Sequence, residues 1–290
     1  MKAQRTPVAF FVLTYLVSWT IWIATNLLLA KEPSSLASLT GVTGLLLLIG
    51  TIAPSLVALA LTARETGPDG VRALLSRIVI LPTQLQWYVF AAGLMASVKL
   101  CVVLLHRILA GSWPAMGETP WYIMAVATVL STPVQAGEEI GWRGYALPRL
   151  SRWRGLPAAS VILGVIWACW HLPLFFVPGA NAGESFPMYL FAVTAISIAM
   201  AWLYWRTNGS LLLTMLMHAA SNNTASIVRA PAAANPFALR PSLIGGLTVV
   251  LLWIPATYFL VRMSAANARD DWEQRTDSNG LGSTRRVQLT

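Results

Sequence analysis

The chain has 290 residues, of which 56% are hydrophobic and only 11% are charged, and its formal net charge is +9. A soluble domain is about 45–50% apolar and about 25% charged, so this composition excludes an ordinary soluble protein and predicts a polytopic membrane protein. The basic residues lie in short loops beside apolar stretches, where they would set membrane topology, so we expect no nucleic-acid partner. Cys101 and Cys169 lie inside apolar runs and predict neither a disulfide framework nor a zinc site.

Eight apolar stretches approach the roughly 20 residues that a helix needs to cross the hydrocarbon. The first is too long for a signal-peptide core and lacks a small-residue cleavage site, so we expect it to be retained. The fold class predicted is all-α, a polytopic bundle of about eight transmembrane helices. The expected spans are 8–30, 41–62, 87–109, 121–148, 156–177, 187–204, 210–228 and 242–261.

Prolines and polar segments mark the expected breaks. Pro133 predicts a kink in the fourth helix, and Pro148 predicts its end. Residues 71–80 fit either an amphipathic helix at the membrane interface or a short helix in a soluble loop. We expect a membrane domain over residues 1–263, with its motif core at 121–228. Residues 264–290 are polar and are expected to form a disordered cytoplasmic tail.

The arginines and lysines indicate the orientation of the helices. If both termini are cytoplasmic, only Lys31, Arg107, Arg229 and Arg240 of the loop residues fall outside, and the remaining basic residues lie inside. The expectation is therefore a multi-pass protein of the cell membrane with both termini in the cytoplasm. This topology puts the charged segment 138–143 on the cytoplasmic side of the fourth helix.

Polar residues inside the apolar stretches are candidates for function because hydrocarbon penalises them. Three sets stand out, and in each set two side chains are four residues apart and share a helix face. An ion pair within the first set would hold one of its two carboxylates ionised. The sets are Glu138, Glu139 and Arg143; Trp167 and His171; and His218 and Asn222.

These residue types are the parts for hydrolysing an amide by direct attack of water. A carboxylate with a histidine can deprotonate a water, and a second histidine with an asparagine can stabilise an oxyanion. The chain has no GxSxG or HExxH motif, and we expect no metal and no cofactor. Simpler readings exist: Glu-Glu as an interfacial anchor, and each histidine as an interhelical hydrogen-bond donor. His106 is assigned such a structural role, and Lys99 could face protein, water or the interface.

The order Glu-Glu-x-x-x-Arg, aromatic-x-x-x-His and His-x-x-x-Asn resembles the CPBP family, also called the Abi or CAAX-protease family, of intramembrane glutamic endopeptidases. The matching segments are 138–143, 167–171 and 218–222. The resemblance implies a bundle of eight transmembrane helices with a cavity open to the cytoplasm. It also implies a peptide or protein substrate, lipidated in some relatives, and no metal.

The resemblance also implies roles for single residues. Glu138 would be the general base, helped by His171, and His218 with Asn222 would form the oxyanion site. Glu139, paired with Arg143, would support the site or share the catalytic role. The family usually has Phe where this chain has Trp167, and we expect the larger ring to narrow the cavity without touching the acid–base groups.

Two further expectations compete with catalysis, and one difficulty stands against it. The chain could be a non-catalytic immunity-type membrane protein of the same fold, or a transporter whose Glu and His relay protons. On the expected boundaries Glu138 lies near the end of its helix. His171 lies about 15 residues, or roughly 22 Å, into the fifth. Two straight helices with these boundaries would not bring the two side chains together.

Overall fold

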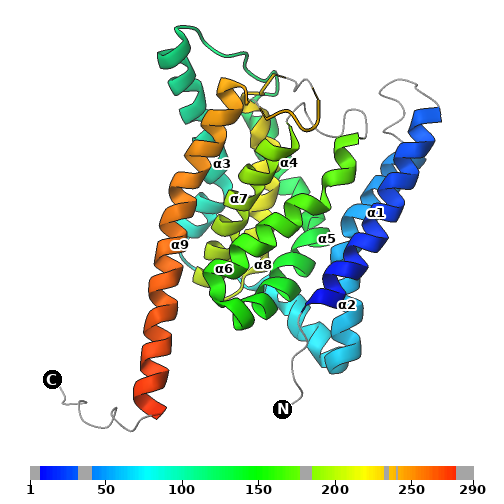
Figure 1. Cartoon of the computed structure of the whole chain (residues 1–290), viewed down its shortest axis with the longest axis vertical. Helices are drawn as coiled ribbons and strands as arrows, with labels where there is room; N and C mark the ends of the chain where they lie inside the picture. The colour runs from blue at the N-terminus through cyan, green and yellow to red at the C-terminus, as the bar shows by residue number, and fades with distance from the viewer. Residues whose placement is uncertain (1–6, 32–40, 177–184, 232–234, 240, 279–290) are drawn as a thin grey trace, which may run out of the picture.

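The computed structural model describes residues 7–31, 41–176, 185–231, 235–239 and 241–278. Within these ranges the chain is helical, apart from connecting segments and one isolated antiparallel bridge between Met116 and Val228. Figure 1 shows a bundle with α1 and α2 side by side on one flank and α9 on the other. The elements are α1 (Val8–Lys31), α2 (Val42–Leu75), η2 (Ser76–Val79), α3 (Leu85–Ala110), α4 (Trp121–Ser131), η3 (Pro133–Gln135), α5 (Ala136–Glu139), η4 (Ile140–Ala146), α6 (Leu147–Trp170), η5 (Leu172–Phe176), α7 (Phe186–Arg206), α8 (Leu211–Thr224), η6 (Ala225–Ile227) and α9 (Leu243–Ser278).

The all-α, multi-pass architecture predicted from the sequence is confirmed. All eight expected stretches lie on helices, but α4 and α8 have only 11 and 14 residues, too short to cross about 30 Å of hydrocarbon by themselves. Within the described ranges, six segments are long and apolar enough to span a membrane. They are Val8–Leu28, Val42–Val79, Leu85–Ala110, Pro133–Phe176, Phe186–Arg206 and Leu243–Ala266.

Helix α7 lies at the centre of the bundle. Every residue from Val193 to Tyr204 is buried, which is the behaviour of a helix that is apolar on all sides. Lys99 on α3 also turns inward: it is 3% exposed, and its Nζ lies 3.4 Å from Oγ1 of Thr248 on α9. Of the three environments considered for this lysine, the structure therefore selects protein.

The expected end of the fourth helix at Pro148 is wrong. Pro148 lies in the first turn of α6, directly after the π-helical segment η4, and the helix continues through it. The chain instead turns back at Gly155, whose φ of 73° and ψ of 158° interrupt the helix. The expected break at Pro133 is present, because α4 ends at Ser131 and a 3₁₀ turn begins at Pro133.

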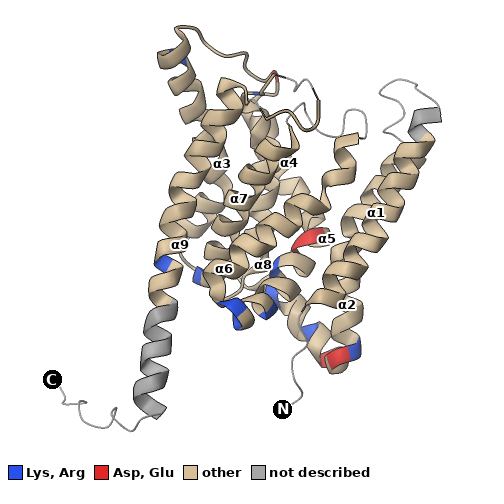
Figure 2. Cartoon of the chain, in the orientation of Figure 1, with Lys and Arg blue, Asp and Glu red and all other residues tan. Residues whose placement is uncertain are grey.

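The turn at Gly155 explains how Glu138 and His171 can lie at the same depth in the bundle. Glu138 precedes Gly155 by about as many residues as His171 follows it, which is roughly 25 Å of helix on either side. The two legs run in opposite directions from the turn, so both residues lie at the same level of the bundle. The expectation that Glu138 lies near a helix end is therefore wrong: α5 and its acidic residues lie at mid-height in the bundle (Figure 2).

Helix α2 packs closely against the segment that carries the acidic residues. Gly137 and Gly141, one turn apart, face α2, and a Cβ on Gly141 would lie 2.6 Å from backbone atoms of Pro54. Small residues at this spacing let two backbones approach in a membrane. Because Pro54 lacks an N–H, the carbonyl oxygen of Gly50 one turn earlier has no helical partner. Oγ of Ser18 on α1 donates a hydrogen bond to this oxygen at 2.8 Å.

Basic residues gather at one end of the bundle, where α2 ends and α6 turns (Figure 2). Arg149, Arg152 and Arg154 lie on α6 before its turn, and Arg206 ends α7. Residues 71–80 also lie here. Arg77 contacts the Tyr204 hydroxyl, so this segment packs on the protein's own helices.

Both ends of the described chain lie toward this basic end: α1 begins there and α9 ends there (Figure 1). Helix α9 continues through Ser278, beyond the expected domain boundary at residue 263. Of the expected tail, residues 279–290 lie outside the described residues.

Candidate active site

Glu139 lies at the centre of a buried polar cluster. Its Oε1 accepts a hydrogen bond from Nη1 of Arg143 at 2.8 Å, and both side chains are fully buried. This is the ion pair expected from the four-residue spacing. The same Oε1 lies 3.0 Å from Nδ1 of His218 on α8, a contact that no sequence pattern indicated. Glu139 therefore joins the first and third polar sets directly.

Glu138 is held by the second set. Nε1 of Trp167 donates to Oε2 of Glu138 at 2.7 Å, and the carboxylate is only 5% exposed. The expectation that Trp167 stays clear of the acid–base groups is therefore wrong. It failed because it treated the indole as an apolar wall, although the ring carries a hydrogen-bond donor.

His171 caps the end of α6 and is surrounded by aromatic rings. Its Nδ1 lies 2.9 Å from the carbonyl oxygen of Trp167. Rings of Trp170 and Tyr189 pack edge-on against the imidazole at 4.7 and 5.5 Å between centroids, and Trp22 stacks at 6.4 Å. Trp22 and Tyr189 were missed by sequence reasoning, because they come from α1 and α7 and share no spacing with His171.

The hydrogen bonds of the two histidines fix which ring nitrogen carries the proton. A carbonyl or carboxylate oxygen only accepts, so Nδ1 of His171 and Nδ1 of His218 must both be N–H donors. In the neutral ring Nε2 is then the atom with the free lone pair. Both histidines therefore present Nε2 for proton transfer.

Trp167 connects the remaining members of the cluster. The guanidinium carbon of Arg143 lies 4.2 Å from the indole centroid, a cation–π distance. The rings of His218 and His171 approach the indole edge-on at 5.1 and 5.9 Å. Glu138 is also close enough to Arg143 and His171 for their charges to interact. One aromatic side chain thus touches groups from α5, η4 and α8.

The cluster has polar atoms with unused hydrogen-bonding capacity. Among the described residues, Oε2 of Glu139 and Nε and Nη2 of Arg143 are buried without a hydrogen-bond partner. Buried polar atoms of this kind are commonly satisfied by ordered water. Two carboxylates, one guanidinium and two imidazoles therefore form one polar cluster in which some donors and acceptors are unpartnered.

Asn222 is not brought into this cluster. It is exposed, and in the described part of the chain it makes no hydrogen bond to either glutamate or either histidine. Its neighbour Asn223 is partly buried and donates to Oγ of Ser131 on α4 at 3.0 Å. His106 also lies apart, with its Nδ1 3.0 Å from the carbonyl oxygen of Ser112.

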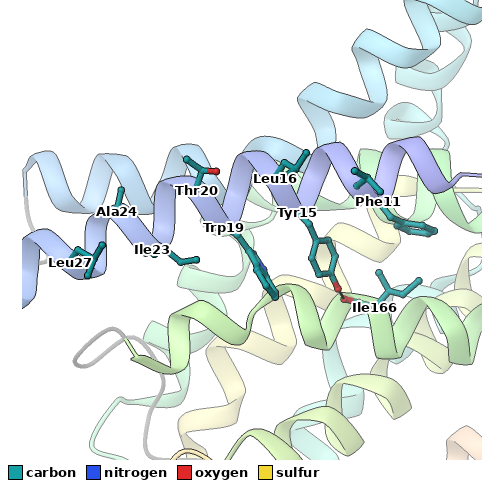
Figure 3. Close-up of a pocket in the computed structure, with 10 residues that line it drawn as sticks. Phe11, Tyr15, Leu16, Trp19, Thr20, Ile23, Ala24, Leu27 and Ile166 are labelled. Atoms are coloured by element: carbon teal, nitrogen blue, oxygen red, sulfur yellow. Dashed lines mark hydrogen bonds between the residues drawn. The ribbon is translucent and has the colours of Figure 1, made fainter.

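The helix that carries Trp167 and His171 borders an apolar groove on its other side. The groove has a volume of about 700 Å³ and is lined by one face of α1 and by Ile166. Tyr15 and Trp19 point from α1 toward α6 (Figure 3), where the Tyr15 hydroxyl donates to the carbonyl of Ile166 and Trp19 Nε1 to that of Trp170. These bonds fasten α1 to α6 beside the cluster.

No three His, Cys, Asp or Glu side chains of the described residues are arranged to hold a metal ion. The expectation that the site uses neither metal nor cofactor stays a prediction, and it is tested below.

Comparison with known proteins shows a similarity in the region of the cluster. Residues 118–224 match the family described as "Type II CAAX prenyl endopeptidase Rce1-like", and this range includes all three polar sets. The chain is 25% identical over 227 residues to CAAX prenyl protease 2 of Methanococcus maripaludis, with 74% of this chain and 82% of that protein covered. The protein is a multi-pass membrane protein, and the part of it that carries the polar sets is similar to the Rce1-like CAAX prenyl endopeptidases.

Proposed function

We propose that the protein is an intramembrane glutamic endopeptidase that hydrolyses a peptide bond with a water activated by Glu138. One observation carries this proposal: two buried carboxylates and two histidines with Nε2 available converge from α5, α6 and α8. Proton-transfer groups so arranged in a membrane domain are costly unless they serve a reaction. The family supports a peptidase of the CAAX type.

The two glutamates have different roles in the proposed mechanism. Glu138 takes a proton from water, assisted by Nε2 of His171, while the water oxygen bonds to the carbonyl carbon of the substrate. His218 acts in its imidazolium form, with Nδ1–H held by Glu139 as the aspartate holds histidine in a catalytic triad, and Nε2–H donates a hydrogen bond to the developing oxyanion. The C–N bond then breaks, and the leaving amine takes up the proton held by Glu138.

The roles first expected for Glu139 and Asn222 change in this proposal. Glu139, fixed by Arg143, acts on the reaction through His218 and is a positioning residue. Asn222 lies one turn beyond His218 and is exposed, so it would meet the substrate itself as it enters. The oxyanion role of Asn222 is therefore proposed only for the complex with substrate.

The substrate proposed is a protein with a prenylated carboxyl-terminal segment, cut at the cytoplasmic side of the cell membrane. The similar protein from Methanococcus maripaludis is named a CAAX prenyl protease, which supports the prenyl group. The basic end of the bundle, where α1 begins and α9 ends, supports a cytoplasmic location for both termini. The lipid bilayer is then the second partner, since it holds the prenyl chain.

The test is cleavage of prenylated and unprenylated CAAX peptides by the purified protein in liposomes. We expect Glu138→Gln and His171→Ala to lower kcat by about 10²–10⁴-fold, the usual contribution of acid–base groups. Glu118→Gln and His106→Ala make the same chemical changes outside the cluster, at an exposed carboxylate and at the histidine of α3, and should retain activity.

Full cleavage by both Glu138→Gln and His171→Ala would show that the proposed mechanism is wrong. No cleavage of either peptide by the wild-type protein would favour a non-catalytic role. Equal cleavage of the two peptides would be compatible with the mechanism but would show that the substrate does not need a prenyl group. Proton-coupled flux through liposomes, without cleavage, would point to a transporter.

A further inference from the structure

Glu138 depends on one side chain for its orientation. Among the described residues, the hydrogen bond that the structure gives this carboxylate comes from Nε1 of Trp167, at 2.7 Å to Oε2. The second oxygen, Oε1, is left for another partner. A carboxylate buried to this degree is stable as an anion only where donors satisfy it.

Trp167 is itself held in place from several directions. Its side chain is 3% exposed, its ring lies under the guanidinium of Arg143, and its edge contacts involve both histidines. Arg143 is fixed in turn by Glu139. The indole N–H therefore has little freedom to point anywhere except at Glu138.

These contacts form a chain from one glutamate to the other. Glu139 binds Arg143, Arg143 lies on the face of Trp167, and Trp167 donates to Glu138. The two carboxylates are thereby held apart in separate roles. Oε2 of Glu138 is occupied, and only Oε1 is available to take a proton from water.

We propose that Trp167 is a positioning residue for the Glu138 carboxylate, and that its indole N–H, rather than the bulk of its ring, is what catalysis requires. The inference rests on the proposed function of Glu138 as the base. It assigns to this chain a hydrogen bond that a phenylalanine at position 167 could not make, because phenylalanine has no donor.

The experiment removes the N–H in two ways. Trp167→Phe removes the donor together with part of the ring, and benzothienylalanine at position 167 replaces the N–H with sulfur while keeping the shape. Both changes should lower kcat by about 10–100-fold, the range for losing a hydrogen bond to a buried charged group. KM should change less than about twofold, since the bond does not involve the substrate.

Trp142→Phe is the matched control. Trp142 lies about one helical turn after the acidic pair and is fully buried against Phe10 and Trp170. Its Nε1 has no hydrogen-bond partner in the described part of the chain. Its replacement removes the same atoms and no hydrogen bond. We expect a lower thermal midpoint in both phenylalanine variants, but a large fall in kcat only at position 167.

The outcomes separate this inference from the proposed function. If Glu138→Gln is inactive and the benzothienylalanine protein has wild-type kcat, the N–H is dispensable and the inference is overturned, while the function stands. Equal effects of Trp167→Phe and Trp142→Phe on kcat would also overturn it. If Glu138→Gln is fully active, the proposed function fails first, and with it the reason for positioning Glu138.

Discussion

The close approach of α2 to the acidic segment makes a graded prediction for three Gly→Ala substitutions. A Cβ at Gly141 would lie 2.6 Å from the carbonyl carbon and oxygen of Pro54, which are backbone atoms that cannot rotate away. At Gly137 the nearest atom is the side-chain Cγ2 of Ile52 at 2.8 Å, with its Cα at 3.3 Å. At Gly93, in α3, nothing lies within 4 Å.

The three substitutions should therefore change the free energy of unfolding by amounts that differ in sign and size. Gly93→Ala should be neutral or stabilise the protein by up to about 1 kcal/mol, since alanine restricts the unfolded chain and favours helix. Gly141→Ala should destabilise it by about 1–3 kcal/mol or more, the usual cost of overpacking. Gly137→Ala should lie between them, because a side-chain methyl can yield where a backbone cannot.

The assay is thermal unfolding of the three variants in one detergent, with peptide cleavage measured on the same preparations. Gly141 is the second residue of η4, the segment that carries Arg143. A Cβ that pushes η4 away from α2 should therefore also lower kcat. If Gly141→Ala unfolds at the same temperature as Gly93→Ala, then α2 and η4 do not touch at this glycine, and the packing described here is refuted.

Two further predictions concern charge and metal. Arg143→Met should destabilise the protein by about 3–5 kcal/mol, because it removes the guanidinium that compensates the buried charge of Glu139, and Glu139→Gln in the same chain should restore part of that loss. Unfolding of the single and double variants measures this, and equal stability of the two would contradict the ion pair. Preincubation with EDTA should leave cleavage unchanged, and a loss that added metal restores would show that the reaction needs a metal ion.

Contacts within one helix could be predicted from the sequence, whereas contacts between helices could not. Glu139 and Arg143 are four residues apart, and helical geometry alone brings them together. The bond between Glu139 and His218 joins residues 79 positions apart. The three polar sets could be recognised as one site only through their resemblance to a family, because periodicity does not show which faces of α5 and α8 meet.

The errors at Pro148 and Trp167 have the same origin. Each residue was assigned its commonest effect, proline as a helix terminator and tryptophan as an apolar wall. Pro148 follows the π-helical segment η4, where the helix continues, and Gly155 makes the turn instead. Trp167 lies opposite a buried carboxylate, to which its N–H donates a hydrogen bond. In both cases tertiary surroundings, which a single sequence does not display, decided the outcome.

Because the chain turns back at Gly155, the number of residues in each leg decides whether Glu138 and Trp167 lie opposite each other. Since the legs before and after it run antiparallel, inserting a residue in one leg alone would slide Glu138 past Trp167 by about 1.5 Å and rotate it by about 100°. Insertions at the turn itself would leave the pair aligned. The length of each leg, rather than the total number of residues between the two motifs, therefore sets how far Glu138 and Trp167 lie from the basic end of the bundle.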